Sequence, residues 1–155
     1  MNLIALTVLM HLISKNVSSI LVEQERRFKM KTRFYLCKKS KVVFHSCMDN
    51  CEKMLCSDDQ LTELVPNISD ANEEKHLPVI NINSDFITVS VGSVIHPMDD
   101  NHYISFIYLE TEKSGQIKYL NPGDKPIVTF FIKNDKPTAV YEYCTLHGLW
   151  KTDII

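Results

Sequence analysis

Five side chains that bind transition metals in other proteins lie between residues 76 and 147: His76, His96, His102, Cys144 and His147. His96 and His102 stand six residues apart in the stretch HPMDDNHY, and Cys144 and His147 form a C-x-x-H pair. That spacing lets one turn of chain present a thiolate and an imidazole to the same ion. Any one of these residues alone is more typical of a hydrogen-bonded histidine or a small buried cysteine. Together they predict a site for a borderline or soft transition metal, with more ligands than the four that structural zinc takes.

The surrounding sequence predicts short strands, which would carry these side chains at their ends. Residues 80–94 alternate and are rich in Ile and Val, and residues 103–109, 126–132 and 138–144 are aromatic or β-branched. Turn residues at 121–124 (NPGD) and 134–137 (NDKP) separate the last three runs. With almost no helical periodicity, this pattern predicts an all-β antiparallel sandwich or barrel.

Composition limits the function classes. The chain has 155 residues, of which 45% are hydrophobic and 23% charged, enough for one sizeable core and a small second lobe. A net charge of −2 argues against a nucleic-acid partner, because such proteins concentrate Lys and Arg to meet phosphates. The five cysteines are an odd number without a disulfide framework, so we expect a reducing, cytoplasmic location.

The N-terminal segment contains an apolar run at residues 3–13 (LIALTVLMHLI). The run is too short to cross a bilayer as a helix, so no membrane association is predicted. It lacks a preceding basic residue and a following small-residue cleavage site, and it contains His11, which argues against a signal peptide. Because Met30 opens the stretch MKTRFYLC, we interpret residues 1–29 as an extension upstream of the true start.

Three segments of this chain resemble the signature segments of the superoxide reductases, the family that includes desulfoferrodoxin and neelaredoxin. These segments are EKHLPVI, VGSVIHPMDDNHYISFIYLET and YCTLHGLWK, which together fall within residues 73–151. The resemblance implies an immunoglobulin-like antiparallel β-sandwich over residues 61–155 that holds one mononuclear non-haem iron, cycling between Fe2+ and Fe3+. In that family pattern His76, His96, His102 and His147 are the equatorial ligands, Cys144 is the axial ligand, and the position opposite the sulfur is open.

The resemblance also implies the reaction, in which superoxide is reduced by one electron to hydrogen peroxide. In the family pattern Lys75 draws in the superoxide anion and Glu74 becomes a sixth ligand of the oxidised iron; without the resemblance, both would be interpreted as solvated charges. An external electron donor, such as a rubredoxin-type protein, and a homo-oligomer are expected. The alternative is a non-catalytic iron protein on the same sandwich that carries electrons or senses small molecules, and the balance of reduction against dismutation is left open.

Residues 30–60 resemble a degenerate form of the small desulforedoxin-like lobe, in which four thiolates bind a second iron. The stretch FYLCKKSKVVF has Ser40 where the opening C-x-x-C pair has its second cysteine, and Asn50 precedes Cys51. We predict no rubredoxin-like centre and a small, irregular lobe that survives by packing. A non-standard zinc or iron site and a redox-sensitive thiol cluster are the alternatives for Cys37, Cys47, Cys51 and Cys56. The polar stretch 57–74 is predicted to be a linker or an irregular loop.

Overall fold

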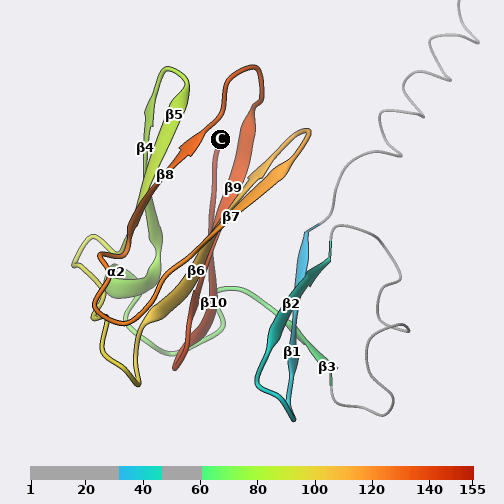
Figure 1. Cartoon of the computed structure of the whole chain (residues 1–155), viewed down its shortest axis with the longest axis vertical. Helices are drawn as coiled ribbons and strands as arrows, with labels where there is room; N and C mark the ends of the chain where they lie inside the picture. Colours follow the sequence, from blue (N-terminus) through green and yellow to red (C-terminus); the bar gives the residue numbers. More distant parts are fainter. Residues whose placement is uncertain (1–31, 47–60) are drawn as a thin grey trace, which may run out of the picture. The chain divides into compact units, whose positions relative to one another are not determined.

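The computed structural model describes residues 32–46 and 61–155 (Figure 1). The predictions for residues 1–29, for a start at Met30, and for Cys47, Cys51 and Cys56 lie outside these ranges. In the described ranges, no helix is both long and apolar enough to cross a membrane.

Two antiparallel sheets form a sandwich, and the larger of them has four strands in the order β10-β9-β6-β7 (Figure 1). Its strands are β6 (Ile104–Thr111), β7 (Gly115–Tyr119), β9 (Pro137–Cys144) and β10 (Gly148–Asp153). The second sheet has the order β4-β5-β8, with β4 (Pro78–Asn83), β5 (Phe86–Val91) and β8 (Ile127–Phe131). The predicted fold class, an all-β antiparallel sandwich, is confirmed.

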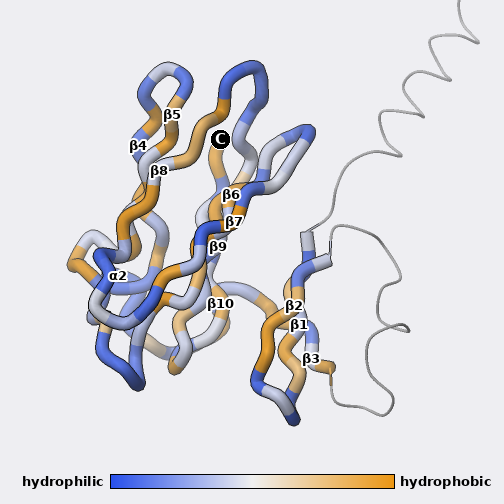
Figure 2. The backbone as a smooth tube through the Cα atoms, in the orientation of Figure 1, coloured by the Kyte–Doolittle hydropathy of each residue, from blue (hydrophilic) through white to orange (hydrophobic). Residues whose placement is uncertain are grey.

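The core lies between these two sheets, because alternate residues of their strands point inward. Ile87, Val89 and Val91 of β5 are completely buried against residues of the opposite sheet. The inward residues from that sheet include Ile104, Ile107, Leu109, Val140 and Cys144. The hairpin tips are hydrophilic and the strand bodies more hydrophobic (Figure 2). Cys144, the last residue of β9, therefore enters the core at one end of the sandwich.

A third, three-stranded antiparallel sheet of order β2-β1-β3 covers part of the outer face of the larger sheet. Its strands are β1 (Arg33–Cys37), β2 (Val43–Ser46) and β3 (Leu61–Leu64). Phe34 is 1% exposed, and its ring stacks on Phe106 at a centroid distance of 5.5 Å and lies 5.2 Å from that of Tyr141. This aromatic cluster is a second hydrophobic core, and it attaches the small sheet to the sandwich.

The structure differs from the predicted elements in four places. Residues 80–94, predicted as one alternating run, form the β4–β5 hairpin, whose turn includes Ser84 in a left-handed conformation (φ 50°). The strands β7 and β10 were not predicted. Within the stretch 57–74, which was predicted to be a linker or loop, β3 pairs with β1. A short helix, α2 (Glu73–His76), begins at the end of that stretch.

Candidate metal centre

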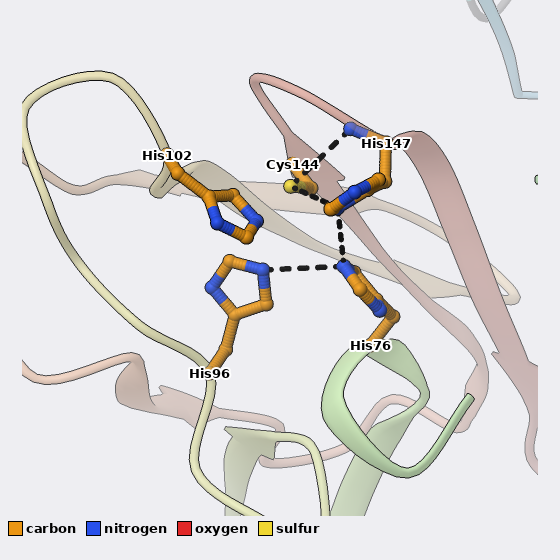
Figure 3. Close-up of side chains that lie close together, drawn as sticks. All are labelled: His76, His96, His102, Cys144 and His147. Atoms are coloured by element: carbon orange, nitrogen blue, oxygen red, sulfur yellow. Dashed lines mark hydrogen bonds between the residues drawn. The ribbon is translucent and has the colours of Figure 1, made fainter. Parts of the chain in front are cut away.

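The five predicted side chains converge at one end of the sandwich (Figure 3). One ligand atom from each of His76, His96, His102, Cys144 and His147 can be chosen so that all five lie within 4.8 Å of one another. Such a separation suits donors that surround a single ion. His76, His96 and Cys144 are buried, whereas His102 and His147 are partly exposed, so the cluster reaches solvent on one side.

Each side chain comes from the end of an element or from a loop. His76 is the last residue of α2, and His96 and His102 lie in the loop between β5 and β6. Cys144 ends β9, and His147 lies in the tight turn that leads into β10. Gly148 follows with φ +83°, the left-handed conformation that allows this turn to close in so few residues.

Backbone carbonyls orient two of the imidazoles. Nδ1 of His76 lies 2.7 Å from the carbonyl oxygen of Asn72, and Nδ1 of His96 lies 2.5 Å from that of Pro97. A carbonyl can only accept, so each Nδ1 carries the proton and each Nε2 keeps its lone pair. The Asn72 side chain also accepts from the backbone N–H of Glu74 at 2.9 Å, as an N-cap of α2. Asn72 therefore holds His76 in place in two ways.

These lone pairs point at one another, and that arrangement fits a cation. Nε2 of His76 lies 3.2 Å from Nε2 of His96 and 2.9 Å from Nδ1 of His147. Two lone-pair nitrogens at the first distance repel each other unless a positive charge lies between them. Nε2 of His102 is buried and finds no hydrogen-bond partner among the described residues. A metal ion would satisfy all of these nitrogens at once.

Three of the imidazoles, those of His76, His96 and His102, are held in the neutral form that binds metals. Burial is the main cause that lowers the pKa of His76, His96 and His102, and for His96 the pKa falls to about 4. Repulsion among neighbouring imidazoles adds to the effect at each of them. At neutral pH these nitrogens are therefore available as ligands.

Cys144 lies directly beside His147. Its sulfur accepts from the backbone N–H of His147 at 3.4 Å and lies 3.5 Å from Nδ1 of the same residue. Burial raises the pKa of the Cys144 thiol above its usual value, while backbone hydrogen bonds from Leu146 and His147 oppose that rise. A coordinating metal deprotonates a thiol outright, and these backbone N–H groups would then stabilise the thiolate.

Two further residues lie beside the cluster. The ring of Trp150 stacks on His76 at 4.8 Å with an interplanar angle of 18°. Glu142, which was not considered, is completely buried on β9, and burial raises its pKa well above the usual value. The carboxyl oxygens of Glu142 and the Nε1 of Trp150 have no hydrogen-bond partner within the part of the chain that the structure describes. The two residues face each other across the β9–β10 ladder.

Glu74 and Lys75 both lie exposed on α2, next to His76. The positive charge of Lys75 makes a small contribution to the lowered pKa values of His76 and His102. The backbone carbonyl of Glu74 accepts from the N–H of Val94 at 3.0 Å, and this bond ties α2 to the loop that carries His96. The roles predicted for the two side chains stay predictions.

Comparison with known proteins gives a consistent result. The desulfoferrodoxin family model matches residues 68–153. A desulfoferrodoxin from Syntrophotalea carbinolica is 37% identical over 123 residues, which cover 79% of this chain and 97% of the relative. One from Nitratidesulfovibrio vulgaris is 41% identical over 100 residues, which cover 64% of this chain and 79% of the relative. The crystal structure of the superoxide reductase from Treponema pallidum has a TM-score of 0.67 and 33% identity, and the match covers 79% of this chain and 99% of that one. The chain belongs to the desulfoferrodoxin family.

Proposed function

We propose that this protein is a superoxide reductase, an oxidoreductase that converts superoxide to hydrogen peroxide at one mononuclear non-haem iron. The observation that carries the proposal is the convergence of four imidazoles and one thiol within 4.8 Å. The proposed iron ligands are His76, His96, His102, Cys144 and His147. Membership of the desulfoferrodoxin family and the likeness to the Treponema pallidum superoxide reductase support it.

The bound iron supplies the electron, since superoxide needs one electron and two protons to become hydrogen peroxide. The chain contributes charge and orientation. Four neutral imidazoles and one thiolate leave a ferrous site with a net positive charge, which favours an anionic substrate. The thiolate of Cys144 donates electron density, in the sense known for haem thiolates. Buried Trp150 fixes the plane of His76 and keeps water from its face.

Lys75 would attract the substrate. Its exposed side chain lies on α2, one residue before His76, where a single positive charge raises the local concentration of a small anion even though the whole chain is negative. To Glu74, its neighbour on α2, we assign the role of a sixth ligand to the oxidised iron.

Several further assignments follow from the family and from the sequence. An external one-electron donor, such as a rubredoxin-type protein, would return the iron to the ferrous state. We retain the division into an extension (1–29), a desulforedoxin-like segment (30–60) and the iron-binding sandwich (61–155). A cytoplasmic location and a homo-oligomer are likewise proposed.

The visible spectrum and the iron content test the metal centre. The protein should be loaded with Fe(II) without oxygen, then oxidised, alongside the Cys144→Ser variant. We expect one iron per chain and a broad low-energy thiolate-to-iron band that disappears in the variant. A spectrum without this band would show that the thiol does not bind the iron, and the proposed centre would be wrong.

Pulse-generated superoxide tests the reaction itself. The ferrous protein should be oxidised once by superoxide, with one hydrogen peroxide formed per iron. Lys75→Ala should slow this step about tenfold at low salt and less at high salt, because salt screens the attraction. Lys133→Ala removes an exposed lysine outside the cluster and is the matched control. An iron centre that superoxide does not oxidise would instead favour an electron carrier or a sensor.

A further inference from the structure

A cavity of about 270 Å3 lies behind the metal cluster, between the β1–β2 hairpin and the outer face of the larger sheet. Membership of the desulfoferrodoxin family assigns no role to this cavity. Its walls include Phe34, Lys41 and His45 from the hairpin, and Tyr103, Phe106 and Tyr143 from the sandwich. Drug-sized ligands occupy pockets of about 300 Å3 or more, so this volume suits a molecule of one or two fused rings.

The shape and chemistry of the lining favour a flat aromatic molecule. The rings of Phe34 and Phe106 lie 5.5 Å apart at an interplanar angle of 21°, and those of Phe106 and Tyr143 lie 5.7 Å apart at 7°. Phe34 and Phe106 are buried in this stack and form the floor of the cavity, whereas Tyr103 and Tyr143 are partly exposed and provide the rings on which a planar molecule can stack with an offset. The ring of Tyr119, whose residue is 73% exposed, adds an aromatic wall at the edge of the sheet.

The charged and hydrogen-bonding groups of the lining favour a planar molecule that carries a negative charge and an acceptor oxygen. Among the residues that the structure describes, the cavity lining includes Lys41 and no Asp or Glu, so an anionic substituent would be attracted. Lys41 is held at the hairpin turn in a left-handed conformation (φ 60°), where its backbone N–H donates to the carbonyl of Cys37 at 2.8 Å. The hydroxyl of Thr145 accepts from the backbone N–H of Tyr103 at 3.2 Å, which leaves its own hydrogen free to donate to an oxygen of the guest.

The cavity is connected to the metal cluster through the backbone. Tyr103 follows His102, and Thr145 follows Cys144, so two wall residues are each one peptide bond from a proposed ligand. A hydrogen bond of 3.0 Å from the N–H of Thr145 to the carbonyl of Tyr103 joins these two segments. Electrons leaving a molecule in the cavity would therefore have a short covalent and hydrogen-bonded route to the ligands.

We propose that this cavity binds a small aromatic reductant of the quinol class with an anionic substituent, and that this molecule returns the oxidised iron to the ferrous state. The inference rests on the proposed function, because a superoxide reductase needs one electron for each superoxide that it reduces. A hydroquinone gives one electron to the iron and one proton to water and becomes a semiquinone. Two semiquinones then disproportionate to one quinol and one quinone, which balances electrons and protons.

The first test is binding of 1,4-naphthoquinone-2-sulfonate to the iron-loaded protein, measured by titration calorimetry. Lys41→Gln should weaken binding about threefold, the usual effect of an exposed charge pair, and Tyr119→Ala about fivefold through lost stacking. Lys133→Gln, outside the cavity, should leave the affinity unchanged. Absence of binding, or equal affinity in all four proteins, would overturn the proposal.

The second test is reduction of the oxidised centre by the corresponding hydroquinone without oxygen, followed by loss of the thiolate-to-iron band. The rate should saturate with hydroquinone concentration, and half-saturation should shift in Lys41→Gln and Tyr119→Ala by the factors seen in binding. Reduction by dithionite, which needs no cavity, should be equal in both variants. A rate that rises linearly without saturation would refute the cavity as the entry point. If superoxide does not oxidise the ferrous wild-type protein, the proposed function is wrong. If superoxide does oxidise it but the naphthoquinone does not bind, only the proposed role of the cavity is wrong.

Discussion

Gly92 is the position where one added methyl group should separate the metal ligands. Its φ of +80° lies in the left-handed region, and a Cβ there would lie 2.4 Å from the carbonyl oxygen of Val94, 2.7 Å from that of Lys75 and 2.8 Å from that of Glu74. Ordinary contacts begin at 3.4 Å, so the contact with Lys75 on α2 must lengthen by 3.4 − 2.7 = 0.7 Å, and the contact with Val94 inside the loop must relax as well. All three atoms belong to the backbone and cannot rotate away. The loop carrying His96 must therefore move away from α2, which carries His76.

The expected cost of Gly92→Ala has two parts. The left-handed conformation costs an alanine roughly 1 kcal/mol, and forced overlap in a packed site costs about 1–3 kcal/mol more. We expect a loss of about 2–4 kcal/mol in the free energy of unfolding. Gly123→Ala is the matched control, since Gly123 has a φ of +83° and no atom within 4 Å of its added Cβ. It should lose only about 1 kcal/mol.

Urea unfolding and iron analysis measure both consequences. The difference of about 1–3 kcal/mol between the variants corresponds to a melting temperature lower by roughly 4–24 °C, at about 4–8 °C per kcal/mol for a domain of about 100 residues. Gly92→Ala should also bind less than one iron per chain, whereas Gly123→Ala should bind the full amount. Equal stability and equal iron content in the two variants would refute the packing argument.

Three other substitutions test the fold around the site. Phe34→Ala should cost about 3–4 kcal/mol in urea unfolding, because it empties the core under the small sheet, while Phe131→Ala on an exposed face should cost much less. Asn72→Ala should cost about 1 kcal/mol by removing the N-cap of α2, and Asn72→Asp should restore most of that loss. Although burial alone would raise the pKa of Asp135, hydrogen bonds from Thr111, Ser114 and the backbone N–H of Lys136 lower it below the usual 3.8. The pKa of Asp135 is lower in the folded protein than in the unfolded chain. The ionised carboxylate therefore stabilises the fold in full at pH values above the unfolded-state pKa, and this contribution is lost as the pH falls through the folded-state pKa. The stability of Asp135→Asn should therefore change less than that of wild type between pH 6 and pH 3, and parallel urea curves would contradict this.

The fold class could be predicted because its signal is local. The strands β6, β8 and β9 are dense in aromatic and β-branched residues and are bounded by Pro, Gly, Asn and Asp, so their positions follow from composition. The edge strands β7 (GQIKY) and β10 (GLWKTD) carry few such residues. Their pairing depends on the central strands beside them, which a local pattern does not contain. The β4–β5 turn was overlooked because only Ser84 and Asp85 interrupt the alternation.

Part of the candidate site could likewise be predicted from the sequence, and part could not. Residue types and spacing suggested that the four imidazoles and Cys144 belong together, and the structure brings them together. Glu142 could not be predicted, because a carboxylate in an alternating strand is normally assigned to the solvent face. Here Val140, Glu142 and Cys144 share the inward face, since the register of β9 follows the apolar residues on either side. The positions of Asn72 and Trp150 against His76 depend equally on tertiary structure.

The cluster that joins α2 to the β9–β10 turn also has a consequence for the lifetime of the protein. His76 and His147 are 71 residues apart in sequence, so an ion held by both closes most of the sandwich into a ring. By the entropy of loop closure, such a cross-link is worth about 4 kcal/mol, comparable to a disulfide of the same span. Without the ion, the end of the sandwich where α2 meets the β9–β10 turn would unfold first. This end consists of loops and strand ends, and its imidazole lone pairs would repel one another. Chains without the ion would therefore unfold more often and be degraded faster by proteases than chains that hold it.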